Sequence, residues 1–487
     1  MWYNYCMGDF MKNSKKKKNM ISKILGVISL IVYVVFCIFL IMLNMFPIKY
    51  LSLFLGIFTI IYIIFLVFIF VKKIKKKLRI TATIILTLFA ILFGIGIKYL
   101  SETIDFLDVI NNKMLQKETY YVMVLESSNI KDISVLKNKK IGLYNSLNGE
   151  NALTKLQKKV KVKYEEYKDI EEMFEDLQKG KLAAVLINDS IKNLLSSELS
   201  DMNLELKEVH NLSISIEKEE IVKIVDVTKK TFNIYVAGGD AYGSIDNVTN
   251  TDVNMVISVD PINRKLLLTS IPRDYYVNLP SFGKNAYDKL THAGYYGIEE
   301  SVKAVEKLLN IDINYYVKVN FSTVVGVIDA IGGVDVNSDY SFCVTTTGVC
   351  VRKGINHLDG YSAMMFARER QSFTDGDVQR VKNQQKVIEA IINKATSSTA
   401  IITNFSGILN SVSESLSTNM DTKSINKFVK MQLNNMSSWS IESNNLVGTD
   451  LYTINTYTFP GTELYVMKQS EESVDFAKNR INEYIKQ

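Results

Sequence analysis

The chain has 487 residues, too many for one compact core, and its aliphatic residues and phenylalanines are concentrated in the first hundred positions. Much of its net charge of +6 lies in two lysine-rich runs, KNSKKKK at residues 12–18 and KKIKKKLR at 72–79. Both runs flank apolar segments, which favours charges that set membrane topology over a nucleic-acid patch or a solvated tail. We therefore expect a membrane part, one or two globular domains and no nucleic-acid partner.

Three apolar stretches, at about residues 24–45, 51–71 and 80–98, approach the roughly 20 residues that a helix needs to cross a bilayer. Their length and near absence of charge argue against buried core helices, and the lack of a small-residue cleavage site argues against a signal peptide. With both lysine runs cytoplasmic, residues 1–23 are a basic cytoplasmic N-terminus and residues 24–98 cross the plasma membrane three times. Everything after about residue 100 is then extracellular.

A helical stalk at residues 99–119 is expected to lead into a small α/β accessory domain at 120–215. YYVMVLE, KKIGLY and KLAAVLIND are typical of strands, and IEEMFEDLQKG has helical spacing with Gly180 as a stop. This stretch resembles one lobe of a periplasmic solute-binding protein, although a single lobe lacks the cleft in which such proteins hold their ligand. We assign it no ligand.

From residue 228 onward, predicted strands and helices alternate. FNIYVAGGD indicates a strand, DVNMVISVDPINRKLLLTSIPRD two strands and a turn, and IEESVKAVEKLLN an amphipathic helix. INYYVKVN, STVVGVIDAIGG and VDVN continue as strand, helix and strand, and TYTFPGTELYV indicates strand, turn and strand closing the domain. This order predicts an α/β fold, a layered α-β-α domain around one central mixed sheet.

Two aspartates lie beside predicted strand ends. Asp240 follows a glycine pair and Asp252 precedes an apolar run. If these strands are neighbours, the carboxylates converge, and such hard oxygen ligands suit Mg²⁺, which takes the rest of its shell from water and a substrate phosphate. The alternative is that both are turn or cap residues.

Several arginines follow segments that should be buried. Arg273 comes after a strand, Arg368 and Arg370 alternate in FARER, and Arg380 has Gln384 four residues later on the same helical face. Guanidinium groups bind phosphate oxygens in bidentate fashion, so a shared site would suit a pyrophosphate. The alternative is a set of scattered surface ion pairs.

The paired cysteines Cys343 and Cys350, in CVTTTGVC, are candidates for a short-loop disulfide on the outer face. Zinc is the competing interpretation, but no histidine or further cysteine has ligand spacing nearby. His292, in KLTHAGYY, could act as a base, although a role in orienting its loop is favoured.

Eight motifs occur in the order and approximate spacing of the LytR-CpsA-Psr family, whose members are membrane-anchored enzymes that transfer glycopolymers onto bacterial cell walls. They are GGD, the aspartate of NTDV, SIPRDYYVNLP, DKLTHAGYYG, NYYVKVNF, VIDAIGGVDV, LDGYSAMMFARER and GDVQRVKNQQ. The resemblance is strong over a core at residues 228–398 and extends more weakly through a domain at 228–487.

The resemblance implies a role for each matching residue. Asp240 and Asp252 match magnesium-associated aspartates, with Mn²⁺ as the alternative ion. Asp377 matches a residue that orients a guanidinium or the acceptor. The matches to groups that hold the pyrophosphate of a polyprenyl-linked substrate are Arg273, Lys289, Arg368, Arg370, Arg380 and Gln384.

The implied activity is a Mg-assisted phosphotransfer in which a hydroxyl of peptidoglycan attacks the sugar-linked phosphorus and expels polyprenyl monophosphate. Alignment and charge neutralisation suffice for such a displacement. The glycopolymer could be a teichoic acid, a capsular polysaccharide or a secondary wall polysaccharide. Residues 253–336 could line a lipid slot or form a solid core, and the resemblance favours the slot. The alternative function is a polyprenyl-phosphate-binding or regulatory protein without turnover.

Three positions depart from the family pattern, and each loses positive charge. Asn250, Tyr242 and Asn383 stand where the family usually has arginines. Since a charge-assisted hydrogen bond contributes about 1.5–3 kcal/mol, we expect weaker pyrophosphate binding at these positions. The surviving aspartates and arginines favour an active enzyme with altered substrate preference.

Overall fold

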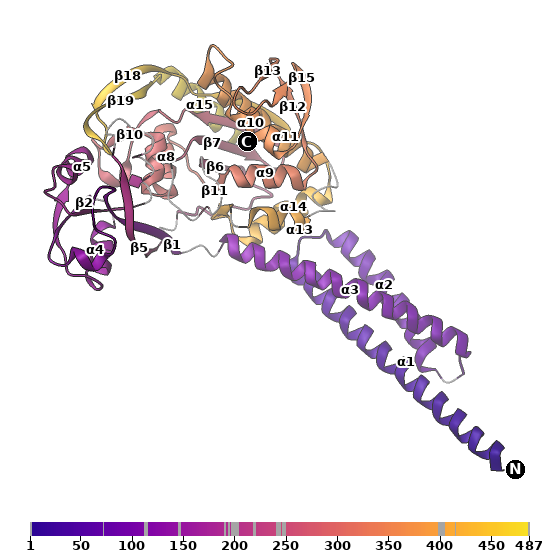
Figure 1. The fold of residues 1–487 in the computed structure, drawn as a ribbon. Coiled ribbons are helices and arrows are strands. Elements are labelled where there is room, and N and C mark those ends of the chain that lie inside the picture. The colour runs from indigo at the N-terminus through magenta and orange to yellow at the C-terminus, as the bar shows by residue number, and fades with distance from the viewer. Residues whose placement is uncertain are drawn as a thin grey trace. The chain divides into compact units, whose positions relative to one another are not determined.

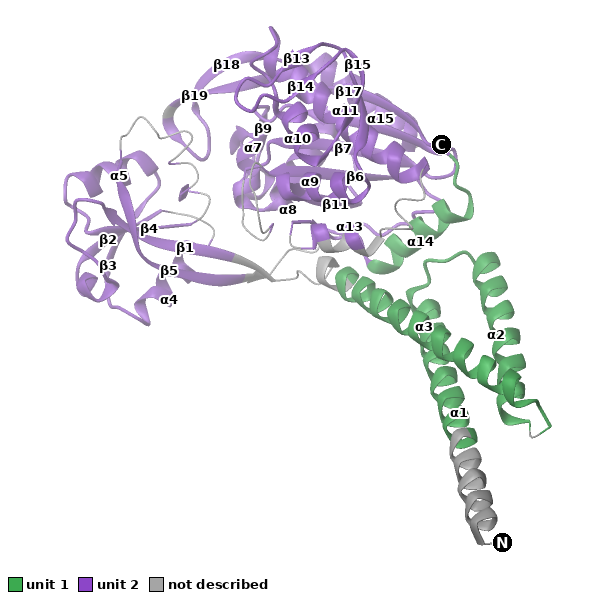
Figure 2. Cartoon of the chain, turned by 45° about the vertical axis from the view of Figure 1, so that its right-hand side comes forward, with its two compact units in different colours: residues 1–108, 422–437 green, residues 109–421, 438–487 purple. Residues whose placement is uncertain are grey.

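The computed structural model describes residues 2–71, 73–111, 115–144, 148–188, 191–192, 195, 204–217, 221–239, 245, 250–397, 405–413 and 415–485. The chain divides into two compact units (Figure 2). The first comprises Met1–Asp108 and Thr422–Ser437, and the second comprises Val109–Asp421 and Ser438–Gln487.

The first unit is helical. Its helices are α1 (Trp2–Leu43), α2 (Ile48–Phe70), α3 (Lys76–Asn111) and α14 (Thr422–Asn434). Three segments, Asn19–Leu43, Ile48–Phe70 and Lys76–Leu107, are long and apolar enough to cross a membrane, as predicted. The Tyr33 and Tyr62 rings stack with their centroids 4.4 Å apart, which packs α1 against α2. α3 continues past the predicted third span, in agreement with a helical stalk.

The accessory domain carries a five-stranded sheet of order β3-β2-β4-β1-β5 (purple to magenta in Figure 1). Its elements are β1 (Leu115–Leu125), β2 (Lys140–Tyr144), α4 (Gly149–Gln157), β3 (Lys163–Tyr167), α5 (Ile170–Gln178), β4 (Ala184–Asn188) and β5 (Leu206–Glu217). β2 is parallel to β3 and β4, with α4 and α5 as crossover helices, and β1 is antiparallel to its neighbours. The predicted strands and helix are present, and β1 begins within the segment predicted as a stalk.

The remaining domain is built on a six-stranded mixed sheet of order β16-β11-β6-β7-β8-β17. Its strands are β6 (Phe232–Gly239), β7 (Val253–Asp260), β8 (Lys265–Ile271), β11 (Tyr315–Asn320), β16 (Ser417–Thr418) and β17 (Ser440–Asn445). The helices around it are α7 (Leu290–Ala293), α8 (Ile298–Leu309), α9 (Phe321–Ala330), α10 (Gly360–Arg368), α11 (Gly376–Ser397), α13 (Phe405–Val412) and α15 (Glu471–Ile485).

Alternation of side chains along the strands creates two cores. Tyr235 and Val256 face a buried cluster that includes residues of α8 and α15. Their neighbours Val236 and Ile257 point to the other face, where they line a cavity together with residues of α9 and α11. Helices thus cover both faces of the sheet (Figure 1), which is the layered α-β-α arrangement expected from the sequence.

Short pairs of strands lie outside the central sheet. β12 (Val334–Ser338) pairs with β15 (Gly354–Leu358), so the VDVN strand is not part of the single sheet around which the sequence placed it. β18 (Gly448–Asn455) and β19 (Pro460–Gln469) form a hairpin, and β9 (Tyr276–Asn278) pairs with β10 (Tyr287–Lys289). Residues 456–459, predicted as a strand, instead form the bend between β18 and β19.

Two glycines allow helix α9 to approach its neighbours closely. A Cβ at Gly360, the first residue of α10, would lie 2.4 Å from the carbonyl oxygen of Val325. A Cβ at Gly326 would lie 2.9 Å from the carbonyl oxygen of Ser411, on α13. Neither position can accept a side chain without movement of a backbone.

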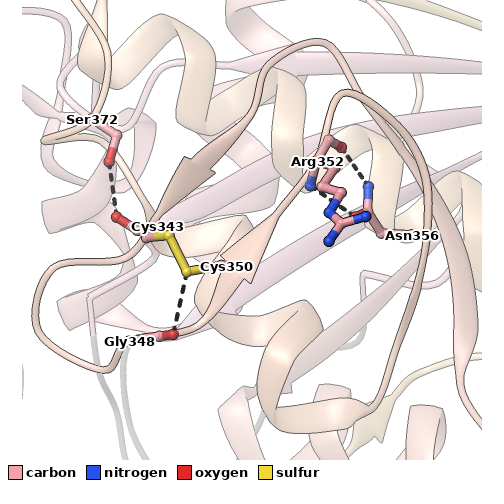
Figure 3. Close-up of a disulfide and its surroundings, with 6 residues drawn as sticks. All are labelled: Cys343, Gly348, Cys350, Arg352, Asn356 and Ser372. Carbon is pink, nitrogen blue, oxygen red and sulfur yellow. Dashed lines mark hydrogen bonds between the residues drawn. A yellow bond between two sulfur atoms is a disulfide. The ribbon is translucent and has the colours of Figure 1, made fainter.

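Cys343 and Cys350 form a disulfide, with their Sγ atoms 2.01 Å apart (Figure 3). They end β13 (Phe342–Cys343) and begin β14 (Cys350–Val351), which pair with each other. The ring of Phe342 stacks on Phe366 of α10 with a centroid distance of 5.8 Å. The disulfide hairpin therefore packs on the helix that ends at Arg368.

Candidate functional site

Four strand ends meet at one edge of the central sheet. β6 and β11 run parallel and both end there, at Gly239 and Asn320, while antiparallel β7 begins there at Val253. β8 is antiparallel to β7 and ends at the same edge at Ile271. Residues that follow or precede these strands, among them Asp252 and Arg273, are therefore brought together although they are far apart in the sequence.

A cavity of about 420 Å³ lies between this part of the sheet and helices α9, α10 and α11. Most of its wall is aliphatic. Its apolar residues are Val236, Val253, Ile257, Val317, Val319, Phe321, Val324, Val327, Met364, Ala367, Val387, Ile388, Ile391, Ile392 and Leu416. The sequence left open whether residues 253–336 line a lipid slot or form a solid core. Several of them line this cavity, and residues of α11 complete its wall.

The polar part of the wall is dominated by arginines. Arg273, Arg368, Arg370 and Arg380 all line the cavity. They come from three places, namely the end of β8, the end of α10 and the first turns of α11. Among the described residues of the wall, Asp252 is the single acidic one. The cavity therefore combines a long apolar surface with an excess of positive charge.

Arg273 is held by two carboxylates. Its Nη1 donates to Oδ1 of Asp252 at 2.9 Å, and its Nε donates to Oδ2 of Asp274 at 3.3 Å. Burial lowers the pKa of the Arg273 guanidinium, but the charges of Asp252 and Asp274 outweigh burial and raise it. The cation is thus fixed in position at the end of a buried strand.

The positive charge of Arg380 is less fully compensated by carboxylates than that of Arg273. Arg380 is 9% exposed, and its Nη2 pairs with Asp377 Oδ1 at 3.0 Å. Its Nε is buried and has no hydrogen-bond partner among the described residues. Burial lowers the pKa of Arg380, opposed by the charge of Asp377. An unpaired N–H of a buried cation is costly, and the positive charge of Arg380 at the cavity wall favours an anionic ligand there.

Arg368 lies over an aromatic ring. Its guanidinium carbon is 4.3 Å from the centroid of Phe321, a cation–π contact. Phe321 is the first residue of α9, whose N-terminus is fixed by a capping box between Asn320 and Thr323. Sequence reasoning gave Phe321 no role, although the motif NYYVKVNF contains it.

Lys289 and Gln384 have different surroundings. Gln384 lines the cavity beside Arg380. Lys289 is 5% exposed and outside the cavity wall, and its Nζ lies 3.7 Å from Asp274 Oδ1. Lys289 thus contacts Asp274, the carboxylate that holds Arg273, and does not line the cavity itself.

The aspartates predicted to hold a metal are described only in part. Asp240 follows Gly239 and lies outside the described residues, as does Tyr242. Asp252 precedes β7, whose Val253 pairs with Gly238, so the two strands are neighbours as the prediction required. No group of three or more histidine, cysteine or acidic residues suitable for a metal occurs among the described residues. A cation here would need water and phosphate oxygens for most of its shell, as Mg²⁺ accepts.

Two of the three departures from the family pattern lie within the described residues. Asn250 Nδ2 is 3.4 Å from Asp252 Oδ1, so this position is beside the arginine cluster. Asn383 is 1% exposed and does not line the cavity. Its Nδ2 donates to the Phe366 carbonyl at 3.2 Å, and its Oδ1 accepts from Gln379 at 2.9 Å. The Asn383 side chain thus bonds to α10 and within α11 and does not reach the cavity, and the expected loss of a pyrophosphate contact at this position stays a prediction.

Comparisons with known proteins identify the family of this chain. The sequence profile described as the LytR_cpsA_psr family matches residues 198–474, more than half of the chain. A polyisoprenyl-teichoic acid–peptidoglycan teichoic acid transferase, TagU of Bacillus mycoides, is 34% identical over 223 residues, covering 45% of this chain and 71% of the relative. The corresponding TagT of Bacillus subtilis is 31% identical over 270 residues, covering 53% and 81%.

One similar solved structure carries the description LytR-CPS2A-psr family protein YwtF (TagT) with bound octaprenyl pyrophosphate lipid. It is 26% identical, covers 55% of this chain and 95% of its own, and gives a TM-score of 0.41. A TM-score this low adds nothing to the family assignment. A second profile, described as DNA polymerase processivity factor, matches residues 75–187, a stretch that joins an apolar helix to the accessory domain and carries no functional conclusion.

Proposed function

Because this chain belongs to the LytR-CpsA-Psr family, we propose that it is a membrane-anchored transferase that moves a glycopolymer from a polyprenyl-pyrophosphate carrier to peptidoglycan. The observation that carries the proposal is the cavity in which four arginines meet a continuous aliphatic wall. The named relatives favour a teichoic acid as the polymer, with capsular polysaccharide as the alternative.

The two parts of the cavity suit the two parts of such a carrier. The aliphatic wall would bury isoprenoid methylenes, each contributing about 0.8 kcal/mol. The guanidinium groups would bind phosphate oxygens, and Arg380 offers a buried N–H that has no partner among the described residues. A neutral lipid would leave the excess positive charge of the cavity wall uncompensated, so a pyrophosphate-linked lipid is the better ligand.

The reaction follows from where the charge lies. A hydroxyl of peptidoglycan attacks the phosphorus that carries the glycan, a new O–P bond forms, and the bond to the bridging oxygen breaks. Polyprenyl monophosphate leaves, and the hydroxyl proton passes to solvent. Charge builds up on phosphate oxygens, where Arg273 and Arg380 are already held in place by carboxylates. Pre-organised charge of this kind stabilises the transition state without reorganisation during the reaction.

We further propose Mg²⁺ as a cofactor, with Asp252 and Asp240 as its protein ligands. Asp252 fits this role because it is the described acidic residue of the cavity wall. When bound, the ion would neutralise charge on the phosphate oxygens. In its absence, Asp252 pairs with Arg273 and so keeps that guanidinium oriented.

For the membrane part, we propose that residues 1–23 are cytoplasmic and that the chain beyond the third apolar helix is extracellular, at the plasma membrane. The lysine runs on one side of the helices support this orientation. For the accessory domain, we retain a solute-binding-like lobe as a proposal, supported by the parallel order β3-β2-β4 with two crossover helices.

The test uses the full chain in detergent micelles with a synthetic polyprenyl-pyrophosphate-linked sugar and peptidoglycan fragments. Release of polyprenyl monophosphate is followed with added Mg²⁺ and with EDTA. We expect Mg-dependent release, and a loss of about 100-fold in Arg368→Ala, since removing one preorganised charge-stabilising group costs about 10²–10³ in turnover.

Arg352→Ala is the matched control, because Arg352 is an exposed arginine in the disulfide hairpin region, away from the cavity wall (Figure 3). It should retain full activity. Tight binding of the lipid with no release, across several donors and acceptors, would instead identify a lipid-binding or regulatory protein. Release that is unaffected by EDTA would remove the magnesium proposal and leave the transferase proposal intact.

A further inference from the structure

The bend at residues 456–459 is bound from two sides. From the accessory domain, the hydroxyl of Tyr144, at the end of β2, donates to the carbonyl of Thr458 at 3.1 Å. From the other side, the Thr458 N–H donates to Oδ2 of Asp288 at 2.7 Å. Burial raises the pKa of Tyr144, helped by the charge of Asp288, so its hydroxyl stays protonated and donates.

Apolar side chains also pack between the accessory domain and the bend at residues 456–459. Tyr295, Phe459 and Leu464 belong to one buried cluster with Tyr144, Met173 and other residues of the accessory domain. Phe459 is 1% exposed and Tyr144 is 7% exposed. The accessory domain therefore shares a core with the bend at 456–459 and with the loop that follows α7.

Asp288 links Thr458 to the segment that follows it in the chain. It is fully buried, and its Oδ1 accepts from His292 Nδ1 at 2.6 Å and from the Lys289 N–H at 2.8 Å. Burial alone would raise the pKa of Asp288, but His292 and Thr458 lower it, so the carboxylate is charged. With three donors on two oxygens, Asp288 fixes the start of the segment 288–291.

That segment is bound to the arginine cluster. The Thr291 N–H donates to the carbonyl of Arg273 at 2.8 Å, and the Leu290 N–H donates to the carbonyl of Tyr275 at 2.9 Å. The Thr291 carbonyl accepts from the N–H of Thr251, the neighbour of Asp252, at 3.3 Å. The segment thus lies between the two strand ends that carry Arg273 and Asp252.

We propose that the accessory domain positions the arginine cluster, with Tyr144 as a positioning residue that acts through Thr458 and Asp288 on the segment 288–291. The proposal rests on the proposed function for its effect on turnover. The positioning itself is independent of that function. It gives the accessory domain a role that requires no ligand of its own.

The experiment compares Tyr144→Phe with the unmodified full chain in detergent micelles. Amide hydrogen exchange at residues 288–293 is measured first, because it needs no substrate. Losing one buried neutral hydrogen bond should raise exchange there by about 2- to 10-fold. In the transfer assay, kcat should fall by a similar factor with a smaller change in the KM for the donor lipid, since the arginines remain present but less well oriented.

Tyr167→Phe is the matched control. Tyr167 is 5% exposed in the same cluster, and its hydroxyl donates to Glu165 and Asp176, each at 3.0 Å, within the accessory domain. It should leave exchange at 288–293 unchanged. Unchanged exchange in Tyr144→Phe, or equal changes in both variants, would overturn the proposal. Absence of turnover in the unmodified chain would count against the proposed function alone, because the exchange comparison would still decide the positioning role.

Discussion

Asp252 and Asp288 are two carboxylates of one domain whose surroundings differ. The side chain of Asp252 is 13% exposed at the cavity wall, and it bonds to Arg273 and Asn250. The side chain of Asp288 is completely buried, and His292, Lys289 and Thr458 occupy its two oxygens. The first carboxylate lies where a ligand can enter, and the second lies where none can.

The comparison shows how to separate binding residues from supporting residues. Around the cavity, charge is left incompletely paired, as with the buried Nε of Arg380. Each oxygen of Asp288 accepts at least one hydrogen bond, which is the usual state of a buried polar group that fixes structure. Incomplete pairing in a cavity points to a ligand, whereas complete pairing points to a scaffold.

The largest effect is expected at the scaffold. Asp288→Asn should reduce the free energy of unfolding by about 3–5 kcal/mol, since it removes the charge of the acceptor in three buried hydrogen bonds, and a hydrogen bond to a charged group contributes about 1.5–3 kcal/mol. Because the pKa of Asp288 is lowered in the folded state, its contribution is present at neutral pH and is lost as pH falls through that lowered value. Chemical unfolding at pH 7, followed by the fluorescence of buried Trp439, measures the change.

Asp335→Asn is the matched control for Asp288. Asp335 and His357 form the same kind of pair at 2.8 Å, but their side chains are 60% and 61% exposed. An exposed pair contributes about 0–1 kcal/mol. Equal losses of unfolding free energy in Asp288→Asn and Asp335→Asn would contradict the distinction between the buried and the exposed carboxylate.

A smaller effect is expected at the cavity, and of a different kind. Arg380→Ala should weaken binding of a polyprenyl pyrophosphate by about 10- to 100-fold, equivalent to a charge-assisted hydrogen bond of about 1.5–3 kcal/mol. Stability should fall little or rise, since the variant removes a buried N–H that lacks a partner among the described residues. Isothermal titration and unfolding of the same preparation test both statements, and a large loss of stability with unchanged affinity would reverse the assignment.

The smallest effects are expected on neighbouring residues of α11. Asn383→Ala should cost about 1–3 kcal/mol of stability, because the Phe366 carbonyl loses its donor and Gln379 its acceptor. Gln384→Ala, at the cavity wall, should weaken lipid binding by about 2- to 10-fold with little loss of stability. Measuring both quantities on both variants shows whether the two faces of α11 are separate, and the same outcome for both variants would mean that they are not.

Local patterns predicted much of this molecule. The three apolar helices follow from long uncharged runs, and β6 to β8 and α8 follow from hydrophobic periodicity. The gathering of Arg273 and Arg368 could be expected because each follows a segment that should be buried. The direction of Asn383 could not, since it depends on the packing of α11 against α10.

Long-range pairs escaped prediction for a physical reason. Thr458 is 170 residues from Asp288 and 314 from Tyr144, and its backbone N–H and carbonyl make these two hydrogen bonds, so the residue type at 458 does not predict them. The sequence of residues 456–459 is rich in β-forming residues, which favoured a strand. The bend forms instead because tertiary contacts on both sides outweigh that propensity.

The close approaches at Gly326 and Gly360 bear on the width of the cavity. Helix α9, which contributes Val324 and Val327 to the wall, lies against both glycine contacts on sides that the cavity does not touch. An added methyl group at Gly360 would push α9 away from α10. Because α9 forms part of the cavity wall, this shift would change the space available to a ligand. The width of the cavity thus depends in part on two glycines that do not line it.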